Sequence, residues 1–344
     1  MKVGVAMSGG VDSTAAALLL KEQGHDVVGF HIYMHEYSAQ SWSAVQEIAR
    51  RVEIPITMVD LRRDFQEVVI SHFVGEYARG RTPSPCLVCN KVIKMGLLRD
   101  HALRMGCDKL ATGHYAQIIQ GAGGAVLRRG IDPKKDQAYF LAMVSREDLD
   151  TVILPLGTMT KSQTREMLRK RGIFIPDSAD SQELCFIRGQ TYREYLLERK
   201  VTPQPGPIVD IRGRRLGTHP GIESFTVGQR RGLRISAAQP LYIVAIDAKT
   251  HTIVVGPAEH AVIQGIEVEE FNRIRETPIS VGETMWVKVR STSAPTLATV
   301  ESVDENTLNL RFHNPQRGVA PGQAAVLYTE DQVVGGGWIR ATAR

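Results

Sequence analysis

Apolar and polar residues follow two different periods along the first half of the chain. Four apolar runs rich in β-branched residues predict strands at 3–7, 26–33, 56–59 and 109–112. Between them, apolar residues three and four positions apart predict helices at 13–23, 41–52, 65–79 and 90–105. Strands that alternate with helices favour an α/β domain, in which helices cover both faces of a parallel sheet. In such sheets, ligands bind at the carboxyl ends of the strands.

The pattern changes in the second half of the chain. A basic helix is predicted at 161–171, with Thr160 as its N-cap. The segment 202–207 contains three prolines and a glycine, which indicates a linker. Beyond it lie short alternating segments, typical of small β-domains or barrels, at 241–246, 252–255, 285–289, 297–300, 308–312 and 324–328. We therefore predict a catalytic α/β domain, a small β-rich domain and a final β-barrel at 1–200, 201–262 and 263–344.

The composition is that of a folded, water-soluble protein. Hydrophobic residues make up 43% of the 344 residues, and charged residues make up 23%. The longest apolar run, 15–20, is shorter than the roughly 18 residues that a membrane helix needs. The first residues lack the charged and then apolar plan of a signal peptide. We therefore expect a cytoplasmic protein.

Positive charge is in slight excess. The 42 Lys and Arg residues against 37 Asp and Glu residues give a net charge of +5, which permits a polyanionic partner without requiring one. Basic residues gather at 161–171, 212–215 and 230–234. Such clusters are expected of a protein that binds a phosphate backbone, but each one alone could equally form a solvated face.

A glycine-rich loop, Ser8-Gly9-Gly10-Val11-Asp12-Ser13, follows the first predicted strand and opens the first helix. Two adjacent glycines let the backbone N–H groups approach a ligand, and the helix N-terminus adds partial positive charge. The loop lacks the Gly-Lys-[Ser/Thr] of a Walker loop and the third glycine of a dinucleotide loop. It therefore predicts a phosphate site of another kind.

The four cysteines, Cys86, Cys89, Cys107 and Cys185, are too few for a disulfide framework in a chain of this length. Cys89 lies at or just before the start of the predicted helix 90–105, where the helix dipole and nearby lysines should lower its thiol pKa. That position suits a nucleophile, and a buried inert cysteine is the alternative. One Cys-x-x-Cys pair is a weak zinc signal, because a structural zinc needs four ligands. Cys185 could supply a third thiolate, and Cys107 is predicted to be structural.

Seven short segments, in this order, resemble the tRNA-specific 2-thiouridylases, a family of PP-loop ATP pyrophosphatases. The segments are 8–13, the Pro-x-Pro-x-x-x-Cys-Asn-Lys stretch at 83–91, 111–115, 135–141, 180–182 with 185–187, 228–233 and 321–323. Each segment alone is short. The ordered set is nevertheless specific, and it runs from the first strand to near the end of the chain.

The resemblance implies a reaction on tRNA. ATP and Mg²⁺ would adenylate the C2 oxygen of the wobble uridine, position 34 of the tRNAs for Lys, Glu and Gln, with release of pyrophosphate. Sulfur from a donor such as a cysteine desulfurase or a relay protein would then attack C2 and displace AMP, which gives 2-thiouridine. The uridine would have to leave the base stack to enter the ATP pocket.

The resemblance also implies roles for individual residues. Cys185 would carry sulfur as a persulfide, and Cys89 would be the nucleophile that releases it through a Cys89–Cys185 disulfide. Asp12 would lie near Mg²⁺, and Ser8 and Ser13 would hold pyrophosphate. The ATP contacts would be Ala6, Met7, Ser8, Gly9, Gly10, Val11, Asp12, Ser13, Ile32 and Gly113. Ser84, Pro85 and Cys86 would border the target base, and the other tRNA contacts would be His114, Lys135, Asp136, Gln137 and Gln323.

Two positions depart from the family pattern. Cys86 stands where members commonly carry Asp, and Ile32 stands where a Met is familiar. Three thiolates, Cys86, Cys89 and Cys185, could therefore hold three irons of a [4Fe–4S] cluster and leave the fourth iron open to a sulfide, as in related tRNA thiolases. The persulfide route and the cluster route have equal weight at this stage.

Two other functions fit parts of the pattern. A PP-loop synthetase that adenylates a small-molecule carbonyl for amide formation would need neither cysteines at its pocket nor a β-rich tail. An RNA-binding module with a relic nucleotide loop is disfavoured by the intact loop and the matched cysteines. ATP turnover, and its dependence on tRNA, would separate these three functions.

Overall fold

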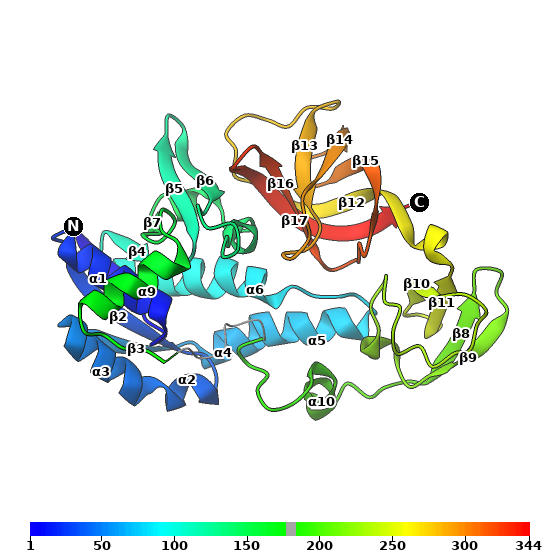
Figure 1. Ribbon diagram of the computed structural model, residues 1–344, viewed down its shortest axis with the longest axis horizontal. Coiled ribbons are helices and arrows are strands. Elements are labelled where there is room, and N and C mark those ends of the chain that lie inside the picture. Colours follow the sequence, from blue (N-terminus) through cyan, green and yellow to red (C-terminus); the bar gives the residue numbers. More distant parts are fainter. Residues whose placement is uncertain (177–183) are drawn as a thin grey trace.

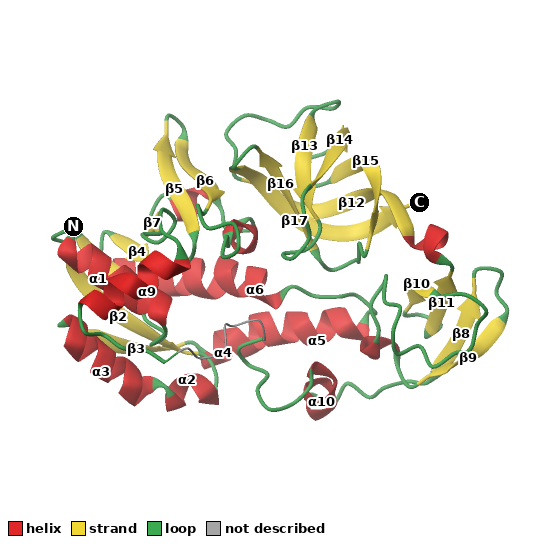
Figure 2. Cartoon of the chain, viewed as in Figure 1, coloured by secondary structure: helices red, strands yellow, loops and turns green. Residues whose placement is uncertain are grey.

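A parallel sheet forms the centre of the first part of the chain (Figures 1 and 2). The computed structural model describes residues 1–176 and 184–344. The strands are β1 (Lys2–Ala6), β2 (Asp26–Tyr33), β3 (Ile56–Asp60), β4 (Lys109–Ala111) and β7 (Val152–Ile153), in the order β3-β2-β1-β4-β7. All neighbouring pairs are parallel, which confirms the predicted α/β class. The two-residue strand β7 is too short to leave a sequence signal.

Helices cover both faces of this sheet. One layer consists of α1 (Val11–Glu22), α3 (Trp42–Val52) and α9 (Lys161–Lys170), with the short α2 (Glu36–Gln40) before α3. The other layer consists of two long helices of consecutive segments: α4 (Arg62–Asp64), η1 (Phe65–Ile70) and α5 (Ser71–Ala78), then α6 (Pro85–Val88), η2 (Cys89–Leu98) and α7 (Arg99–Arg104). Each layer has its own apolar cluster, around Val5 and Ala16 on one face and around Phe30 and Ile93 on the other.

The second long helix begins earlier than the sequence predicts. It starts at Pro85 rather than near residue 90, so Cys89 lies in its second turn. Proline is favoured at the first helical position, because its missing N–H would have no partner there and its φ is already helical. The pair of prolines at 83 and 85 therefore marks the helix start rather than a longer loop.

A β-hairpin projects from the first part of the chain. Its strands are β5 (Ala116–Gly121) and β6 (Gly124–Arg129). Shorter elements follow: η3 (Ala138–Leu141), α8 (Arg146–Leu149) and α10 (Tyr192–Glu198). Unexpectedly, β6 also pairs with the strand β17 of the C-terminal barrel, through Arg128 and Gln332. The hairpin therefore extends the barrel sheet, a pairing between distant segments that no local pattern reveals.

The middle of the chain forms a small four-stranded sheet with its own apolar core. Its strands are β8 (Gly206–Asp210), β9 (Arg215–His219), β10 (Tyr242–Asp247) and β11 (Thr252–Gly256), in the order β10-β11-β8-β9. Two short 3₁₀-helices, η4 (Ile222–Ser224) and η5 (Ala258–Ala261), follow β9 and β11 along the chain. Because β8 begins at Gly206, the last two residues of the predicted linker 202–207 belong to a strand.

The C-terminal part is a closed barrel, as predicted. Its strands are β12 (Val262–Arg273), β13 (Thr284–Lys288), β14 (Thr296–Val303), β15 (Leu308–Arg317), β16 (Ala324–Thr329) and β17 (Gln332–Ala343). The pairing of β12 with β17 closes the ring. Among the described residues, no helix has the length and apolar character needed to cross a membrane.

The sequence analysis missed β12 and β17, the two strands that close the barrel. The strand β17 contains three consecutive glycines, 335–337, which weaken any strand signal. A Cβ atom at Gly335 would lie 2.2 Å from the backbone oxygen of Asn272 on β12, and one at Gly337 would lie 2.6 Å from the Val268 side chain. The glycines are therefore required where the two strands approach each other closely.

Candidate active site

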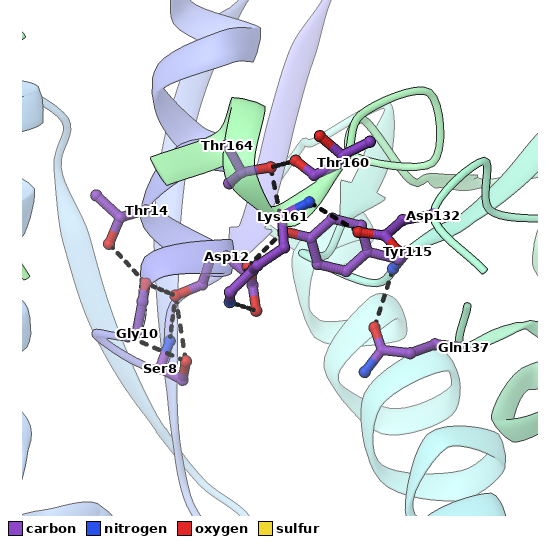
Figure 3. Close-up of polar contacts among 11 residues, drawn as sticks. Ser8, Gly10, Asp12, Thr14, Tyr115, Asp132, Gln137, Thr160, Lys161 and Thr164 are labelled. Carbon is purple, nitrogen blue, oxygen red and sulfur yellow. Dashed lines mark hydrogen bonds and ion pairs between the residues drawn. The ribbon is translucent and has the colours of Figure 1, made fainter. Parts of the chain in front are cut away.

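The glycine-rich loop joins the carboxyl end of β1 to the N-terminus of α1. Gly9 has a φ of +80°, a conformation that favours glycine. The backbone N–H of Ser8 donates to Ser13 Oγ at 3.2 Å, and the Ser13 hydroxyl donates to the Gly10 carbonyl at 3.2 Å. Thr14 Oγ1 also donates to Gly10 O at 2.9 Å (Figure 3). These bonds fix the loop at the start of α1, where backbone N–H groups are free to bind an anion.

Asp12 is held at this loop by two groups from other elements. Both of its carboxylate oxygens accept hydrogen bonds from Lys161 Nζ, at 2.7 and 2.8 Å, and the Tyr115 hydroxyl donates to Oδ1 at 2.8 Å (Figure 3). Asp12 is the only carboxylate that lines the adjacent cavity among the described residues. It is thus the group that could hold a Mg²⁺ ion here, since Mg²⁺ usually binds one or two carboxylates together with substrate phosphates.

A cavity of about 470 Å³ opens at the carboxyl ends of β1, β2 and β4. The expected ATP contacts that line it are Ala6, Met7, Ser8, Asp12, Ser13, Ile32 and Gly113. Among the expected sulfur-transfer and tRNA residues, those that line it are Pro85, Cys86, Cys89, His114, Gln137 and Cys185. The phosphate loop and the three thiols therefore share one chamber.

The remaining expected site residues lie outside the cavity lining. Gly9, Gly10 and Val11 belong to the phosphate loop itself, and Ser84 precedes α6. The Asp136 carboxylate accepts hydrogen bonds from the backbone N–H groups of Gly130 and Ala138, and Lys135 lies in the same turn. Of the matched segment 180–187, residues 180–183 lie outside the described residues, and Cys185 lies within them.

Gln323 of the barrel contacts the segment that leads into α6. Its side-chain amide donates to the carbonyl oxygens of Thr82 at 2.9 Å and of Pro83 at 3.3 Å. The Thr82 N–H in turn donates to the Pro321 carbonyl at 2.9 Å. The barrel therefore positions the residues just before Pro85 and Cys86, which border the cavity.

The pKa values of all three cavity thiols are raised above that of a free cysteine. Burial raises the pKa of the Cys89 thiol to about 12, and its side chain is only 7% exposed. Desolvation at the cavity wall also raises the pKa of the Cys86 and Cys185 thiols, although both residues are solvent-exposed. The ammonium of Lys94, which also lines the cavity, lowers all three pKa values but does not outweigh burial.

The expected lowering of the Cys89 pKa is therefore wrong for the free protein. The expectation depended on a helix N-terminus at Cys89, but the helix begins four residues earlier, and the dipole effect falls off within the first turn. Desolvation of the thiolate then dominates. Cys107, by contrast, is buried and does not line the cavity, as a structural cysteine would be.

The titration of Cys89 can be measured directly. Because its pKa is raised, the thiolate fraction at pH 7 is small, and alkylation by iodoacetamide should accelerate about tenfold per pH unit between pH 7 and 10. Mass spectrometry of the peptide that contains Cys89, after timed alkylation at each pH, gives these rates. A rate that levels off below pH 8 would show a lowered pKa and contradict this prediction.

His114 is a neutral imidazole in the wall of the same cavity. It is buried, and its Nδ1 lies 2.7 Å from the Thr112 hydroxyl. Burial holds its pKa well below the ordinary value, and Lys94 acts in the same direction. His114 can therefore serve as a neutral hydrogen-bonding group toward whatever enters the cavity.

Several cavity or loop residues escaped the sequence analysis. The basic cluster 161–171 predicts either contact with a phosphate backbone or a solvated face for Lys161, and Tyr115 stands in the matched segment 111–115 without a role of its own. Asn90, whose amide donates to the Phe140 carbonyl at 3.0 Å, and Arg188 also line the site. A place in a matched segment is the usable sequence signal for Asn90 and Tyr115, whereas the roles of Lys161 and Arg188 depend on tertiary contacts. Among the described residues, no group of three or more His, Cys, Asp or Glu side chains surrounds a single metal ion position.

Comparison with known proteins gives three consecutive family matches. Residues 1–189 match the family described as the tRNA methyl transferase HUP domain. Residues 194–257 match the tRNA methyl transferase PRC-barrel domain, and residues 263–339 match the aminomethyltransferase beta-barrel domain. Together they span nearly the whole chain.

Curated relatives are similar over almost their full length. The tRNA-specific 2-thiouridylase MnmA of Rickettsia peacockii (strain Rustic) is 40% identical over 356 residues, which covers 99% of this chain and 97% of that protein. The tRNA-specific 2-thiouridylase MnmA of Herpetosiphon aurantiacus is 40% identical over 351 residues, with 98% of each covered. Among solved structures, the U34-tRNA thiolase NcsA from Methanococcus maripaludis with its [4Fe-4S] cluster is 18% identical, with a TM-score of 0.37, and the match covers 58% of this chain and 65% of that chain.

Proposed function

Since this chain belongs to the tRNA-specific 2-thiouridylase family and is a tRNA sulfurtransferase, we propose that its cavity performs both the adenylation and the sulfur transfer. The observation that carries this proposal is the shared chamber: the phosphate loop and the thiols of Cys86, Cys89 and Cys185 line one cavity. A small-molecule amide synthetase would have no use for three thiols at its ATP site. An RNA-binding module would have no use for an ordered phosphate loop.

The chain uses ATP, and we assign the nucleotide to the half of the cavity formed by β1, β2 and α1. Ser8, Ser13 and the loop N–H groups would hold the pyrophosphate portion, and Asp12 would bind Mg²⁺. Ile32, near the end of β2, and Gly113, just after β4, would contact the adenosine portion. In this position the α-phosphate faces the rest of the chamber, where the C2 oxygen of a flipped uridine would attack it.

The thiols supply the second half of the reaction. In the persulfide route, the terminal sulfur on Cys185 attacks C2 of the adenylated uridine and displaces AMP. The Cys89 thiolate then attacks the Cys185 sulfur, which releases the thiolated uridine and leaves a Cys89–Cys185 disulfide. An external dithiol must reduce that disulfide before the next turnover.

Cys86 makes a second route possible at the same place. Three thiolates on one chamber form the donor set that a [4Fe–4S] cluster with one open iron requires. Cys86, Cys89 and Cys185 would hold that cluster, which would present sulfide to the activated uridine. In this route no disulfide forms between Cys89 and Cys185.

tRNA is the macromolecular substrate, and we propose that the tRNAs for Lys, Glu and Gln are thiolated at uridine 34, with a cysteine desulfurase or a relay protein as the sulfur donor. Lys135, Asp136 and Gln137 would contact the tRNA beside the cavity mouth. Gln323 would act from the barrel, through its bonds to Thr82 and Pro83 next to the base-contacting Ser84 and Pro85.

The proposal is tested by nucleoside mass spectrometry on unmodified tRNA for Lys. The tRNA is incubated with ATP, Mg²⁺ and a sulfur source, with iron-free protein and anaerobically reconstituted protein in parallel. We expect ATP-dependent 2-thiouridine, and none in a transcript with cytidine at position 34. Equal yields from both proteins support the persulfide route, and yield from the reconstituted protein alone supports the cluster. No thiouridine from either protein would contradict the proposed function.

A further inference from the structure

Lys161 is largely buried at the phosphate loop, whereas Arg169 and Lys170 at the other end of its helix are exposed. It is the first residue of α9, and its side chain crosses to α1 and Asp12 (Figure 3). Its side chain is 13% exposed, compared with 68% for Lys170 at the other end of the same helix. Because Lys161 lies next to the expected ATP site and not on the surface, it is a candidate ligand-binding residue of that site.

The fold holds Lys161 in place from several directions. Its backbone N–H donates to Asp132 Oδ2 at 3.0 Å, and Thr160 and Gln163 form a capping box around the start of α9. Its ammonium lies over the Tyr115 ring, 5.9 Å from the centroid. Asp132 stabilises the turn of the expected tRNA contacts as well, since its Oδ1 accepts the Lys134 N–H at 3.0 Å. Lys161 is therefore preorganised rather than a mobile surface lysine.

The charge balance of the loop suggests what this ammonium does. Asp12 places a negative charge where a triphosphate must bind, and Lys161 neutralises it in the nucleotide-free protein. When Mg²⁺ arrives with ATP, the carboxylate has a stronger partner, because Mg²⁺ prefers carboxylate and phosphate oxygens. The Lys161 ammonium is then released within reach of the phosphates that the loop holds.

We propose that Lys161 is a pyrophosphate-binding residue of the ATP site, which pairs with Asp12 until Mg²⁺·ATP binds and then pairs with the β- and γ-phosphates. The inference deepens the proposed adenylation and rests on it. In that step, a bond forms between the uridine C2 oxygen and the α-phosphorus, and the bond from the α-phosphorus to the bridging oxygen breaks. The electron pair stays on the pyrophosphate, and the positive charge of Lys161 stabilises it as it leaves.

The test compares Lys161→Met with Lys161→Arg in the full chain without tRNA. Isothermal titration calorimetry measures the affinities for inorganic pyrophosphate with Mg²⁺ and, separately, for AMP, which lacks the leaving group. We expect Lys161→Met to weaken pyrophosphate binding about 10- to 100-fold while AMP binding changes less than about twofold. Arginine should restore part of the pyrophosphate affinity. Lys170→Met, on the exposed end of α9, is the matched control and should change neither affinity.

Two results would overturn the inference. Unchanged pyrophosphate affinity in Lys161→Met would remove the proposed contact, and an equal loss of pyrophosphate and AMP binding would show that Lys161 only maintains the loop. Circular dichroism of each variant establishes that the chain is folded. Because these measurements use no tRNA and no sulfur, a failure of the thiolation assay would not alter their outcome.

Discussion

Replacing Cys89 or Cys185 with serine is expected to lower 2-thiouridine formation by a factor of about 1,000 or more. Both thiols line the cavity, and each would be essential in either proposed route, as sulfur carrier and nucleophile or as cluster ligands. The serine hydroxyl occupies nearly the same volume but is neither a persulfide carrier nor a good iron ligand. Nucleoside mass spectrometry measures the product, and pyrophosphate release should persist for one turnover because the phosphate loop is untouched.

The matched control is Cys107→Ser. This cysteine is 5% exposed and does not line the cavity, so its replacement should leave thiolation near the wild-type rate. Thiouridine at a wild-type rate from Cys89→Ser or Cys185→Ser would contradict the proposed sulfur chemistry. A loss of pyrophosphate release in these variants would instead mean that the thiols support the ATP site.

Substitution of Cys86 distinguishes the persulfide route from the iron–sulfur cluster route. If sulfur travels as a persulfide, Cys86→Asp introduces the residue that the family resemblance leads us to expect at this position, and thiolation by iron-free protein should continue. If the cluster is used, the same variant loses a ligand, and both bound iron and product should fall. Iron content measured alongside thiouridine therefore assigns the route without reference to Cys89 or Cys185.

The parts of the site that the sequence predicted are those set by local backbone. The loop at Ser8–Ser13 follows a strand and opens a helix, and the structure shows both. Thr160 begins α9 through a capping box with Gln163, three residues on, which is a signal readable from the sequence alone. In each case the residues that form the feature are neighbours along the chain.

The parts that the sequence did not predict depend on contacts between distant segments. The partnership of Asp12 with Lys161 joins residues 149 positions apart, and the burial that raises the Cys89 pKa comes from packing around the cavity. The start of α6 at Pro85 was missed because a proline pair fits a loop as well as a helix start. The pairing of β6 with β17 likewise has no local signature.

Gly113→Ala is expected to weaken productive ATP binding about 100-fold without unfolding the chain. A Cβ atom at Gly113 would lie 2.7 Å from the backbone carbon of Asp12, 2.8 Å from its carbonyl oxygen and 2.9 Å from the Ser13 nitrogen. Backbone atoms cannot rotate away as a flexible side chain can, so the phosphate loop must shift relative to the end of β4. A displacement of about 1 Å in a catalytic constellation costs on the order of 100-fold in rate. AMP formation in the presence of tRNA, and calorimetric affinity for Mg²⁺·ATP, should both fall by about that factor.

Gly75→Ala is the control for the added methyl group. Gly75 lies within α5, where a Cβ atom would meet only the Arg79 guanidinium at 3.7 Å, and alanine favours the helix by up to about 1 kcal/mol. Its ATP affinity should equal that of the wild type. For Gly113→Ala, overpacking should cost about 1 to 3 kcal/mol of stability, so thermal unfolding should remain cooperative at a lower midpoint. Wild-type ATP affinity in Gly113→Ala would mean that the loop tolerates displacement from β4, and the close contact between Gly113 and Asp12 would then have no role in holding the phosphates.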